Sequence, residues 1–214
     1  MDTLALFLAD ARLPAAGHTQ SGGLEPGLAD GLDPADLPAY CRTRLATVTR
    51  TEAATAVVTR HRVLAGLPLD AVESAWAART PSDAMRATSR TLGRGLLRLA
   101  RRAWPTAVQW GPDERPPRPM VLGAVAAATG LPAADLVRVI GYDDVQTVLA
   151  AGLKLLPLDP ADAAAWCVGL LPDVEALAVL GTLTDPDRIP ATGAPVIEAW
   201  AQAHARATRR LFSA

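Results

Sequence analysis

Hydrophobic side chains recur every three or four residues along most of the chain, and proline and glycine divide it into segments of ordinary helix length. No segment shows the strict alternation of a half-buried strand. The pattern predicts an all-α, single-domain helical bundle of about ten helices spanning residues 1–214. We expect helices over a short N-terminal apolar segment (Leu4–Leu8), Leu24–Gly31, Pro34–Leu64 (continuous or restarted midway), Leu69–Ala78, Ser82–Trp104, Met120–Thr129, Pro132–Ile140, Asp143–Leu156, Asp162–Leu171, Asp173–Leu183 and Pro195–Phe212.

Two proline-rich or glycine-rich stretches interrupt these helices, and both are predicted to be loops. One lies at 106–119, where prolines crowd around Glu114 and Arg115, and the other at 185–193. Asp33 before Pro34 has the sequence of a capped helix start, and the stretch from Thr80 to Asp83 is expected to open the next long helix. Ser21 is the expected cap of the helix that begins at Leu24.

The helix expected over 82–104 has one apolar face and one basic face. At about 100° per residue, the apolar side chains fall on one arc and five arginines fall on the opposite side. Asp83 is the only nearby carboxylate in this segment. The stripe is therefore either a solvated face, an ion-pair seam within the protein or a docking surface for an acidic partner. Its members are Arg86, Arg90, Arg94, Arg98 and Arg101.

The closing segment 195–212 also has a single seam, formed by Ile197, Trp200, His204, Ala207 and Leu211, with Arg206, Arg209 and Arg210 outside it. Leu211 and Phe212 lie where a chain normally frays. An apolar pair at that place either packs on the protein's own core or is offered to another protein.

Composition narrows the class of protein. Of the 214 residues 50% are hydrophobic and only 4% aromatic, and the formal net charge is −1, which argues against a general nucleic-acid binder. The two cysteines have no metal or disulfide spacing, which fits a reducing cytoplasm. The start Met1-Asp2-Thr3 lacks a basic leader, and no uninterrupted apolar run is long enough for a membrane span. We therefore expect a soluble cytoplasmic protein.

The sequence contains no pattern typical of a catalytic or metal centre. The histidines His18, His61 and His204 are far apart and form no metal-ligand motif. No phosphate-binding lysine loop and no nucleophile motif is present, and Lys154, the only lysine, lies in a predicted helix. The pair Asp143-Asp144 is expected at a helix start, where the helix dipole accounts for two carboxylates.

Four ordered blocks resemble the UreF family of urease accessory proteins, which are nickel-insertion chaperones. The first, residues 10–25, resembles the family signature Asp-Ser-x-Leu/Phe-Pro-x-Gly-x-Phe/Tyr-x-His/Tyr-Ser-x-Gly-Leu-Glu, with departures at His18 and Gln20. It agrees at Asp10, Leu13, Pro14, Gly17, Ser21, Gly23, Leu24 and Glu25. The other blocks are 86–99 (Ser-x-x-x-Gly-x-x-Leu-Leu-Arg-Leu), 153–158 (Lys-Leu-x-Pro-Leu) and the ending Arg-Leu-Phe-Ser at 210–213.

The resemblance implies a non-catalytic homodimer that joins a UreD/UreH-type accessory protein through its C-terminal helix and tail, 195–214. It also implies recruitment of a UreG-type GTPase and GTP-dependent delivery of nickel to the urease apoprotein. Nickel and GTP would belong to the assembled complex, with neither bound by this chain alone and no nucleic acid or membrane involved. The alternatives are an all-α ligand-binding regulator and a helical enzyme of unknown chemistry.

We expect partner-binding residues in four places: the signature at 10–25, the arginine stripe, Lys154 and the C-terminal tail. The resemblance, the basic face of the helix over 82–104 and the apolar pair at the chain end support this expectation. We expect residues 10–25 to form an interaction surface without a metal site. The expected partner-binding residues are Pro14, Gly17, His18, Ser21, Glu25, Arg86, Arg90, Arg94, Arg98, Lys154, Arg209, Arg210, Leu211 and Phe212.

Overall fold

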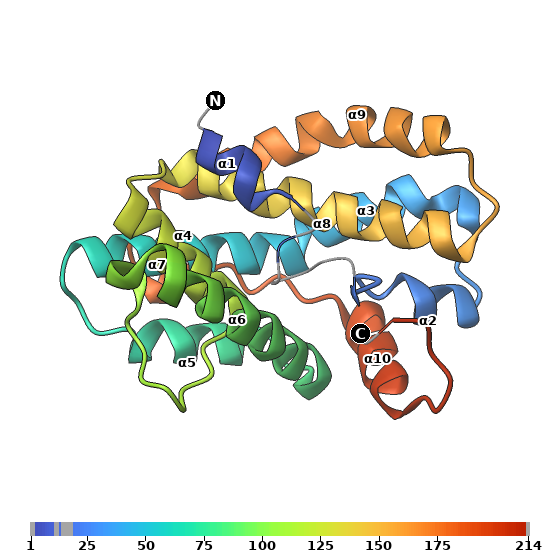
Figure 1. Cartoon of the computed structure of the whole chain (residues 1–214). Helices are drawn as coiled ribbons and strands as arrows, with labels where there is room; N and C mark the ends of the chain where they lie inside the picture. Colours follow the sequence, from blue (N-terminus) through green and yellow to red (C-terminus); the bar gives the residue numbers. More distant parts are fainter. Residues whose placement is uncertain (1–2, 11–12, 14–18, 213–214) are drawn as a thin grey trace.

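A computed structural model describes residues 3–10, 13 and 19–212 of the chain (Figure 1). The described residues contain helices and no strand, which confirms the predicted all-α bundle of about ten helices. The helices are α1 (Thr3–Leu8), α2 (Leu24–Ala29), α3 (Leu37–Ala46), α4 (Val48–Leu64), α5 (Asp70–Ala78), α6 (Asp83–Ala103), α7 (Arg118–Thr129), α8 (Ala133–Leu155), α9 (Pro160–Ala176) and α10 (Pro195–Arg206). Short 3-10 turns occupy Pro34–Asp36, Pro105–Ala107, Leu177–Thr182 and Pro186–Arg188.

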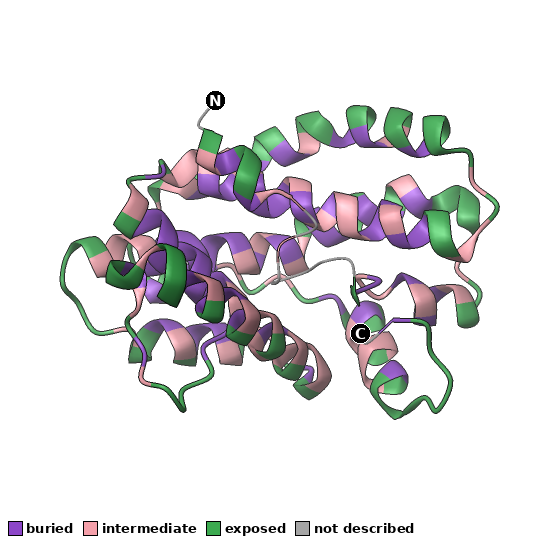
Figure 2. Ribbon diagram, viewed as in Figure 1, coloured by how far each residue is buried: buried purple, intermediate pink, exposed green. Residues whose placement is uncertain are grey.

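The centre of the bundle is α4, which packs against both α7 and α8 (Figures 1 and 2). Nearly every side chain from Thr49 to Thr59 is buried. Threonines are accommodated there because their hydroxyls donate to carbonyls one turn earlier, as Thr55 does to Thr51 and Thr59 to Thr55, at 2.8 Å each. Alanine and threonine let neighbouring helices approach closely, and Gly123 of α7 lies against Ala56 and Thr59.

The predicted helices over 132–140 and 143–156 are wrong, because the structure has one continuous helix, α8. The sequence predicted a helix end before Gly141, but this glycine lies inside α8. A Cβ at that position would stand 3.0 Å from Val174 of α9, so the glycine is where α9 packs closely against α8. Tertiary packing thus compensates for the poor helix propensity of glycine.

The predicted division of residues 162–183 is also wrong. Helix α9 runs through Pro172 to Ala176, and the rest is the 3-10 turn Leu177–Thr182. Pro172 lies inside the helix and is exposed to solvent. A proline there removes one helix hydrogen bond without ending the helix.

The segment expected over 34–64 restarts midway. Asp33 caps the turn Pro34–Asp36 by accepting from the Ala35 N–H at 2.9 Å, as its sequence predicts. The chain then forms α3, leaves helical geometry at Thr47 (φ −122°, ψ −91°) and enters α4. The closing helix ends at Arg206, six residues before the predicted end, because residues 207–212 turn back toward α2.

The start of α6 agrees with the prediction, since the Ser82 hydroxyl accepts from the Met85 N–H at 3.3 Å. The predicted loop at 106–119 is irregular from Val108 to Pro117 and lies along α6. A Cβ on Gly93 would stand 2.1 Å from the carbonyl oxygen of Pro116. This contact explains why glycine is used in the middle of a long helix.

Candidate functional site: the C-terminal tail, the signature loop and an ionic cavity

The C-terminal tail is held by a carboxylate from the start of α2. The two oxygens of Glu25 accept hydrogen bonds from the backbone N–H groups of Leu211, at 2.6 Å, and Phe212, at 3.0 Å. A carboxylate that receives two backbone N–H groups makes strong, charge-assisted hydrogen bonds. Two ends of the chain, 186 residues apart, are therefore fastened together.

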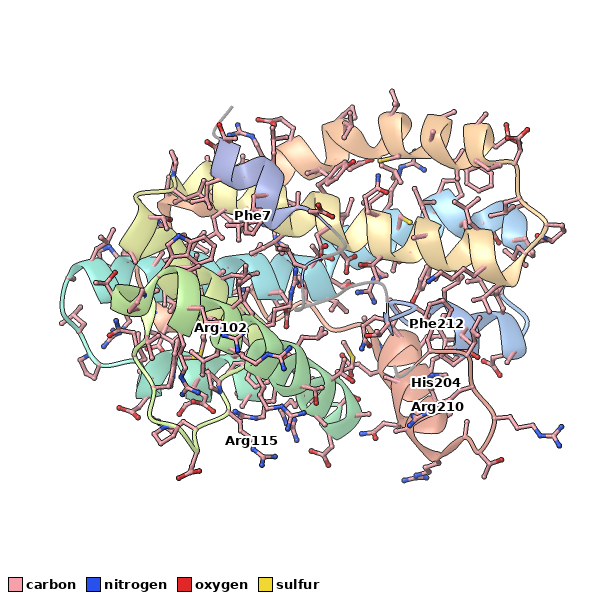
Figure 3. All side chains as sticks on the ribbon, in the orientation of Figure 1. Phe7, Arg102, Arg115, His204, Arg210 and Phe212 are labelled. Carbon is pink, nitrogen blue, oxygen red and sulfur yellow. The ribbon has the colours of Figure 1, made fainter. Side chains whose placement is uncertain are left out.

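Two further side chains complete this contact. The ring of buried His204 places Nε2 3.3 Å from the carbonyl oxygen of Phe212 and 3.6 Å from Glu25. The ammonium of Lys154, from the last turn of α8, lies 5.1 Å from the centre of the Phe212 ring, within cation–π distance. We call Glu25, Lys154, His204 and Phe212 the tail clasp; Figure 3 shows His204 and Phe212 beside α10.

The sequence left open whether Leu211 and Phe212 pack on the protein's own core or face another protein, and the structure shows that the two residues differ. Phe212 is 4% exposed and packs on the protein's own core, whereas Leu211 is 64% exposed. Arg209 and Arg210 are also exposed, and Arg210 contacts the His204 carbonyl oxygen at 3.5 Å. The tail therefore presents Leu211 and two arginines outward while Phe212 fixes it to the body.

In the signature, Pro14, Gly17 and His18 lie outside the described residues. The described part turns at Gly22 and Gly23, both with positive φ (60° and 82°), a conformation that favours glycine. The expected cap at Ser21 is wrong: the N-cap of α2 is Gly23, with no side-chain cap hydrogen bond, and Ser21 is fully buried. The chain turns sharply here, and glycine occupies the N-cap position because it adopts a positive φ without steric cost.

Two side chains of α3 fix this turn. The Tyr40 hydroxyl and the Arg44 Nη1 both donate to the carbonyl oxygen of Gly22, at 2.7 Å each. Burial raises the pKa of the Tyr40 hydroxyl, so it remains a donor. The signature turn is thereby attached to the centre of the bundle.

Arg44 also forms a buried, bidentate ion pair with Asp144 of α8, at 3.0 and 2.5 Å. Burial alone would lower the pKa of Arg44, but Asp144 outweighs it and raises the pKa above its usual range. The adjacent Asp143 pairs with Arg118 of α7 at 2.7 Å. Burial raises the pKa of Asp143, and Arg118 opposes that rise.

The interpretation of Asp143-Asp144 as helix-start carboxylates is therefore wrong. Both lie in the middle of α8, and each neutralises an arginine from another helix. Sequence reasoning missed Arg44 and Arg118 because their partners are 100 and 25 residues away along the chain. The only available signal was the presence of charges among otherwise buried positions.

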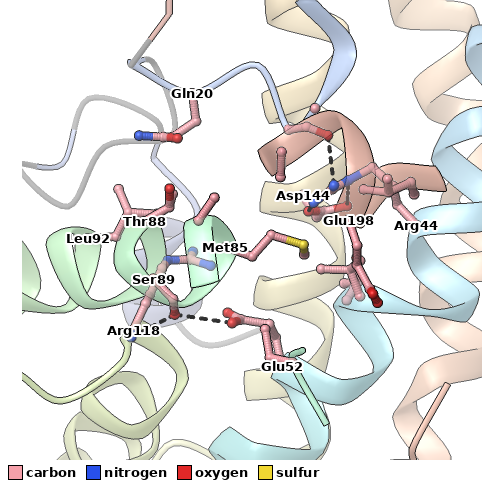
Figure 4. Close-up of a pocket in the computed structure, with 18 of the residues that line it drawn as sticks. Gln20, Arg44, Glu52, Met85, Thr88, Ser89, Leu92, Arg118, Asp144 and Glu198 are labelled. Carbon is pink, nitrogen blue, oxygen red and sulfur yellow. Dashed lines mark hydrogen bonds and ion pairs between the residues drawn. The ribbon is translucent and has the colours of Figure 1, made fainter. Parts of the chain in front are cut away.

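These ion pairs line a cavity of about 490 Å³ between α4, α6, α8 and α10 (Figure 4). Glu52 of α4 faces it and accepts from the Ser89 hydroxyl at 3.2 Å. Burial raises the pKa of Glu52, although Arg118 and Ser89 act in the opposite direction. Among the described residues that line the cavity, Thr49 has a buried hydroxyl without a hydrogen-bond partner.

The structure divides the arginine stripe of α6 into two parts. Arg86 donates to the carbonyl oxygens of Thr80 and Pro81 and pairs with Asp83. Arg90 pairs with Glu73 of α5 at 2.7 Å and lies 5.4 Å from the Trp76 ring. This half is an ion-pair seam within the protein.

The second half of the stripe faces solvent. Arg94 and Arg98 are exposed and make no hydrogen bond or ion pair within the described part of the chain. Arg101 and Arg102 follow on the same helix, both exposed, and Arg102 is labelled in Figure 3. Arg94 and Arg98 can therefore receive an acidic group without first breaking an internal contact, whereas Arg101 donates to the carbonyl oxygen of Gly111 at 2.8 Å.

Residues 3–10, 13 and 19–212 contain no cluster of three or more histidine, cysteine, aspartate or glutamate side chains placed to hold a metal ion. Cys41 and Cys167 are both buried, and burial raises the pKa of the Cys41 thiol to about 12. Within the described residues, Pro160–Thr182 is the one helical segment whose length and apolar composition would suffice to cross a membrane, with 33% of its most apolar stretch buried.

Comparison with known proteins assigns the family. The UreF family profile matches residues 32–171. A urease accessory protein UreF from Mycobacterium sp. (strain JLS) is 36% identical over 214 residues, covering 99% of this chain and 98% of its own length. The UreF proteins of Mycolicibacterium vanbaalenii, 36% identical over the whole of both chains, and Mycobacterium tuberculosis strain CDC 1551, 35% identical over 97% of this chain and 96% of its own, agree with it. The resemblance in the sequence is confirmed, and the chain belongs to the UreF family of urease accessory proteins.

Proposed function

We propose that this chain promotes GTP-dependent incorporation of nickel into the urease apoprotein by binding other maturation proteins, without catalysing a reaction itself. Its partners are a UreD/UreH-type accessory protein, a UreG-type GTPase and apo-urease, and it acts as a homodimer in the cytoplasm. Family membership supports this proposal over a ligand-binding regulator or a helical enzyme.

The observation that carries the proposal is the tail clasp. Terminal residues normally order only when they are tied down, and here Glu25 and Phe212 tie down a segment that presents Leu211 outward. Arginine is enriched among the residues that dominate binding at interfaces, and Arg209 and Arg210 are exposed beside the exposed Leu211. We assign the tail and the adjacent signature to the UreD/UreH-type protein.

The exposed half of the arginine stripe is the second binding surface. Asp83 and the six arginines of α6 give this helix a charge of +5, whereas the whole chain carries −1, so the rest of the chain carries −6. An acidic partner is attracted to such a surface, which raises its rate of association. We assign Arg94 and Arg98 to a partner other than the one that takes the tail.

Nickel and GTP enter this proposal as cargo and as the partner's substrate. The chain contributes neither a phosphate-binding loop nor, among its described residues, a cluster suited to holding a metal ion. Its contribution is to bring the other proteins together in a productive arrangement. Any GTP turnover belongs to the GTPase.

Deletion of residues 209–214 tests the proposal. The truncated protein should stay folded and helical, with a lower unfolding temperature because the buried Phe212 ring is lost, and should lose at least tenfold in affinity for the purified UreD/UreH-type protein. Arg94→Glu/Arg98→Glu should leave that complex intact and weaken the one with the GTPase. Full-length protein that binds none of the three partners would overturn the proposal, as would saturable GTP turnover by the chain alone.

A further inference from the structure

The cavity between α4, α6, α8 and α10 has the size and the wall composition of a small-molecule pocket, and the proposed function makes no use of it (Figure 4). Its volume of about 490 Å³ falls within the roughly 300–1,000 Å³ of ordinary ligand pockets. Such pockets combine apolar walls with a small number of placed polar groups, so the charges in the lining indicate the class of ligand. The apolar wall is formed by Val48, Met85, Leu92, Ile140 and Ile197.

Two of the arginines that line the cavity are already neutralised. Arg44 forms its bidentate pair with Asp144, at 2.5 and 3.0 Å. Arg118 pairs with Asp143 at 2.7 Å. Each of these arginines has a carboxylate of α8 as its counter-ion, so the two pairs together add no net charge to the cavity.

The other two arginines of the lining contact backbone oxygens. Arg79 donates through Nε, Nη1 and Nη2 to three backbone carbonyl oxygens, at distances between 2.6 and 3.0 Å. Arg210 is exposed and contacts the carbonyl oxygen of His204 at 3.5 Å. Neither arginine forms an ion pair with a carboxylate of the described cavity lining.

Two carboxylates of the lining remain, and only one of them is compensated. Glu198 lies in the first turn of α10 and accepts from the Ala194 N–H at 3.1 Å, where the helix N-terminus favours a negative charge. Glu52 lies beyond the first turn of α4. It accepts from the neutral Ser89 hydroxyl at 3.2 Å and forms no ion pair with any described residue. Glu52 is therefore the carboxylate of the described lining that lacks a positive counterpart.

The ionised form of Glu52 is unfavourable without such a counterpart. Burial raises the pKa of Glu52, with Arg118 opposing the rise and Asp144 adding to it. A positive charge brought beside the carboxylate would stabilise its ionised form. The cavity is therefore complementary to a cation, whereas an anionic ligand would add a second uncompensated charge.

The surroundings of Glu52 favour an ammonium group over a metal ion. A divalent metal ion takes several protein ligands, and the described part of the chain holds no cluster of three or more histidine, cysteine, aspartate or glutamate side chains suited to one. An ammonium group has three N–H donors, which one carboxylate and neighbouring hydroxyls can accept. Thr88 and Thr147 bring hydroxyls to the same cavity.

Apolar side chains adjoin this polar centre. Val48 precedes Glu52 by one turn of α4, so the two side chains are neighbours on one face of the helix. Met85 and Leu92 stand two turns apart on one face of α6, and both are half-buried. An alkyl chain attached to the ammonium group would lose apolar surface to water contact no longer once it lay against these residues.

We propose that this cavity binds a free aliphatic amine, with its ammonium group on Glu52 and its alkyl stem against Val48, Met85 and Leu92. A cavity of this volume can enclose a whole small molecule, whereas a lysine of a partner protein would bring only its side chain. The inference goes beyond the proposed function and does not depend on it.

The test uses n-butylamine as the probe, titrated calorimetrically into the purified full chain at pH 7. n-Butanol and butyrate are the matched ligands, because they carry a similar alkyl stem on a neutral and a negative head group. Glu52→Gln removes the charge of the carboxylate at nearly constant shape. Glu114→Gln makes the same change in the exposed loop along α6, outside the cavity lining. The unfolding temperature is measured with and without each ligand, since a ligand that binds the folded state raises it.

We expect n-butylamine to bind at one site and to raise the unfolding temperature, with n-butanol and butyrate at least tenfold weaker. Glu52→Gln should lose at least tenfold in affinity for the amine, and Glu114→Gln should bind it as the parent does. The comparison of the three ligands needs only the parent, so it decides the matter even if Glu52→Gln does not fold.

Three results would overturn the inference. Equal binding of the amine and the alcohol would mean that the cavity selects by the alkyl stem alone. No binding of the amine, or equal binding by Glu52→Gln and the parent, would show that Glu52 holds no ammonium group. Stoichiometric displacement of the bound amine by the UreD/UreH-type protein would assign the cavity to a side chain of that partner. None of these results would refute the proposed function, which is tested by the partner complexes themselves.

Discussion

The carboxylate of Glu25 accepts a hydrogen bond from the backbone N–H of Phe212 across 187 residues of chain. This contact joins the first of the four blocks that resemble the family to the last one, and Lys154 lies over the Phe212 ring beside it. The position of the C-terminal tail is thus decided by the same segment that carries the family signature. A substitution at Glu25 should therefore change how firmly the C-terminal tail is held.

Glu25→Ala is expected to release the tail without unfolding the bundle. Hydrogen bonds to a charged group contribute roughly 1.5–3 kcal/mol each. The loss of even one of them should raise the fraction of molecules with a detached tail about tenfold. Trypsin should then cleave after Arg206, Arg209 and Arg210 about ten times faster, as followed by intact mass. Glu114→Ala, in the loop along α6, serves as the control, and equal cleavage rates in the two variants would show that Glu25 does not hold the tail.

Breaking the Arg44–Asp144 pair should be strongly destabilising. Arg44→Met or Asp144→Asn alone leaves a buried charge without its partner, which costs about 3–5 kcal/mol. The double variant should cost clearly less than the sum of the two, because neither charge is then left alone. Urea unfolding of the parent and the three variants measures the coupling, and strictly additive losses would mean that the pair is not coupled.

Glu52→Gln should stabilise the protein at neutral pH. The pKa of Glu52 is raised in the folded protein, so its contribution to the free energy of unfolding falls as pH rises from the unfolded pKa, about 4.3, through the folded pKa. The gain from Glu52→Gln is about 1.4 kcal/mol for each unit by which the pKa is raised, and it should vanish below pH 4. Thermal unfolding at pH 4 and pH 7 measures it; a gain that is equal at both pH values would contradict the assignment.

Alanine should have opposite effects at two helical glycines. Gly93→Ala forces a Cβ against the Pro116 carbonyl oxygen and should cost about 1–3 kcal/mol, as overpacking does. Gly169→Ala meets no neighbour and should raise the free energy of unfolding by up to about 1 kcal/mol, the difference in helix propensity. Chemical denaturation of both variants is the measurement, and destabilisation by Gly169→Ala would show that the chain itself packs on this position.

Features decided by neighbouring residues were predictable from the sequence. Asp33 caps where it was expected, because a cap depends only on the side chain and the next three residues. The long helix α6 likewise begins within the stretch from Thr80 to Asp83 that was expected to open it. The helical class followed from the spacing of apolar side chains, and family membership from the order of four motifs. The expectation for Ser21 failed because the chain turns at Gly22 and Gly23, both with positive φ, so that Gly23 takes the N-cap position and Ser21 lies outside the helix.

Contacts between distant residues decided the rest. The sequence alone determined that the chain is an all-α protein of the UreF family. Helix periodicity and family motifs both depend on residues that are close together in the sequence. Only the tertiary structure decided that α8 continues through Gly141, that Asp143 and Asp144 are buried counter-ions, and that Phe212 packs inward while Leu211 faces solvent. Each of these depends on which helix lies opposite, and the free energy of burying a charge or a ring is fixed by that neighbour and not by the residues beside it in the chain.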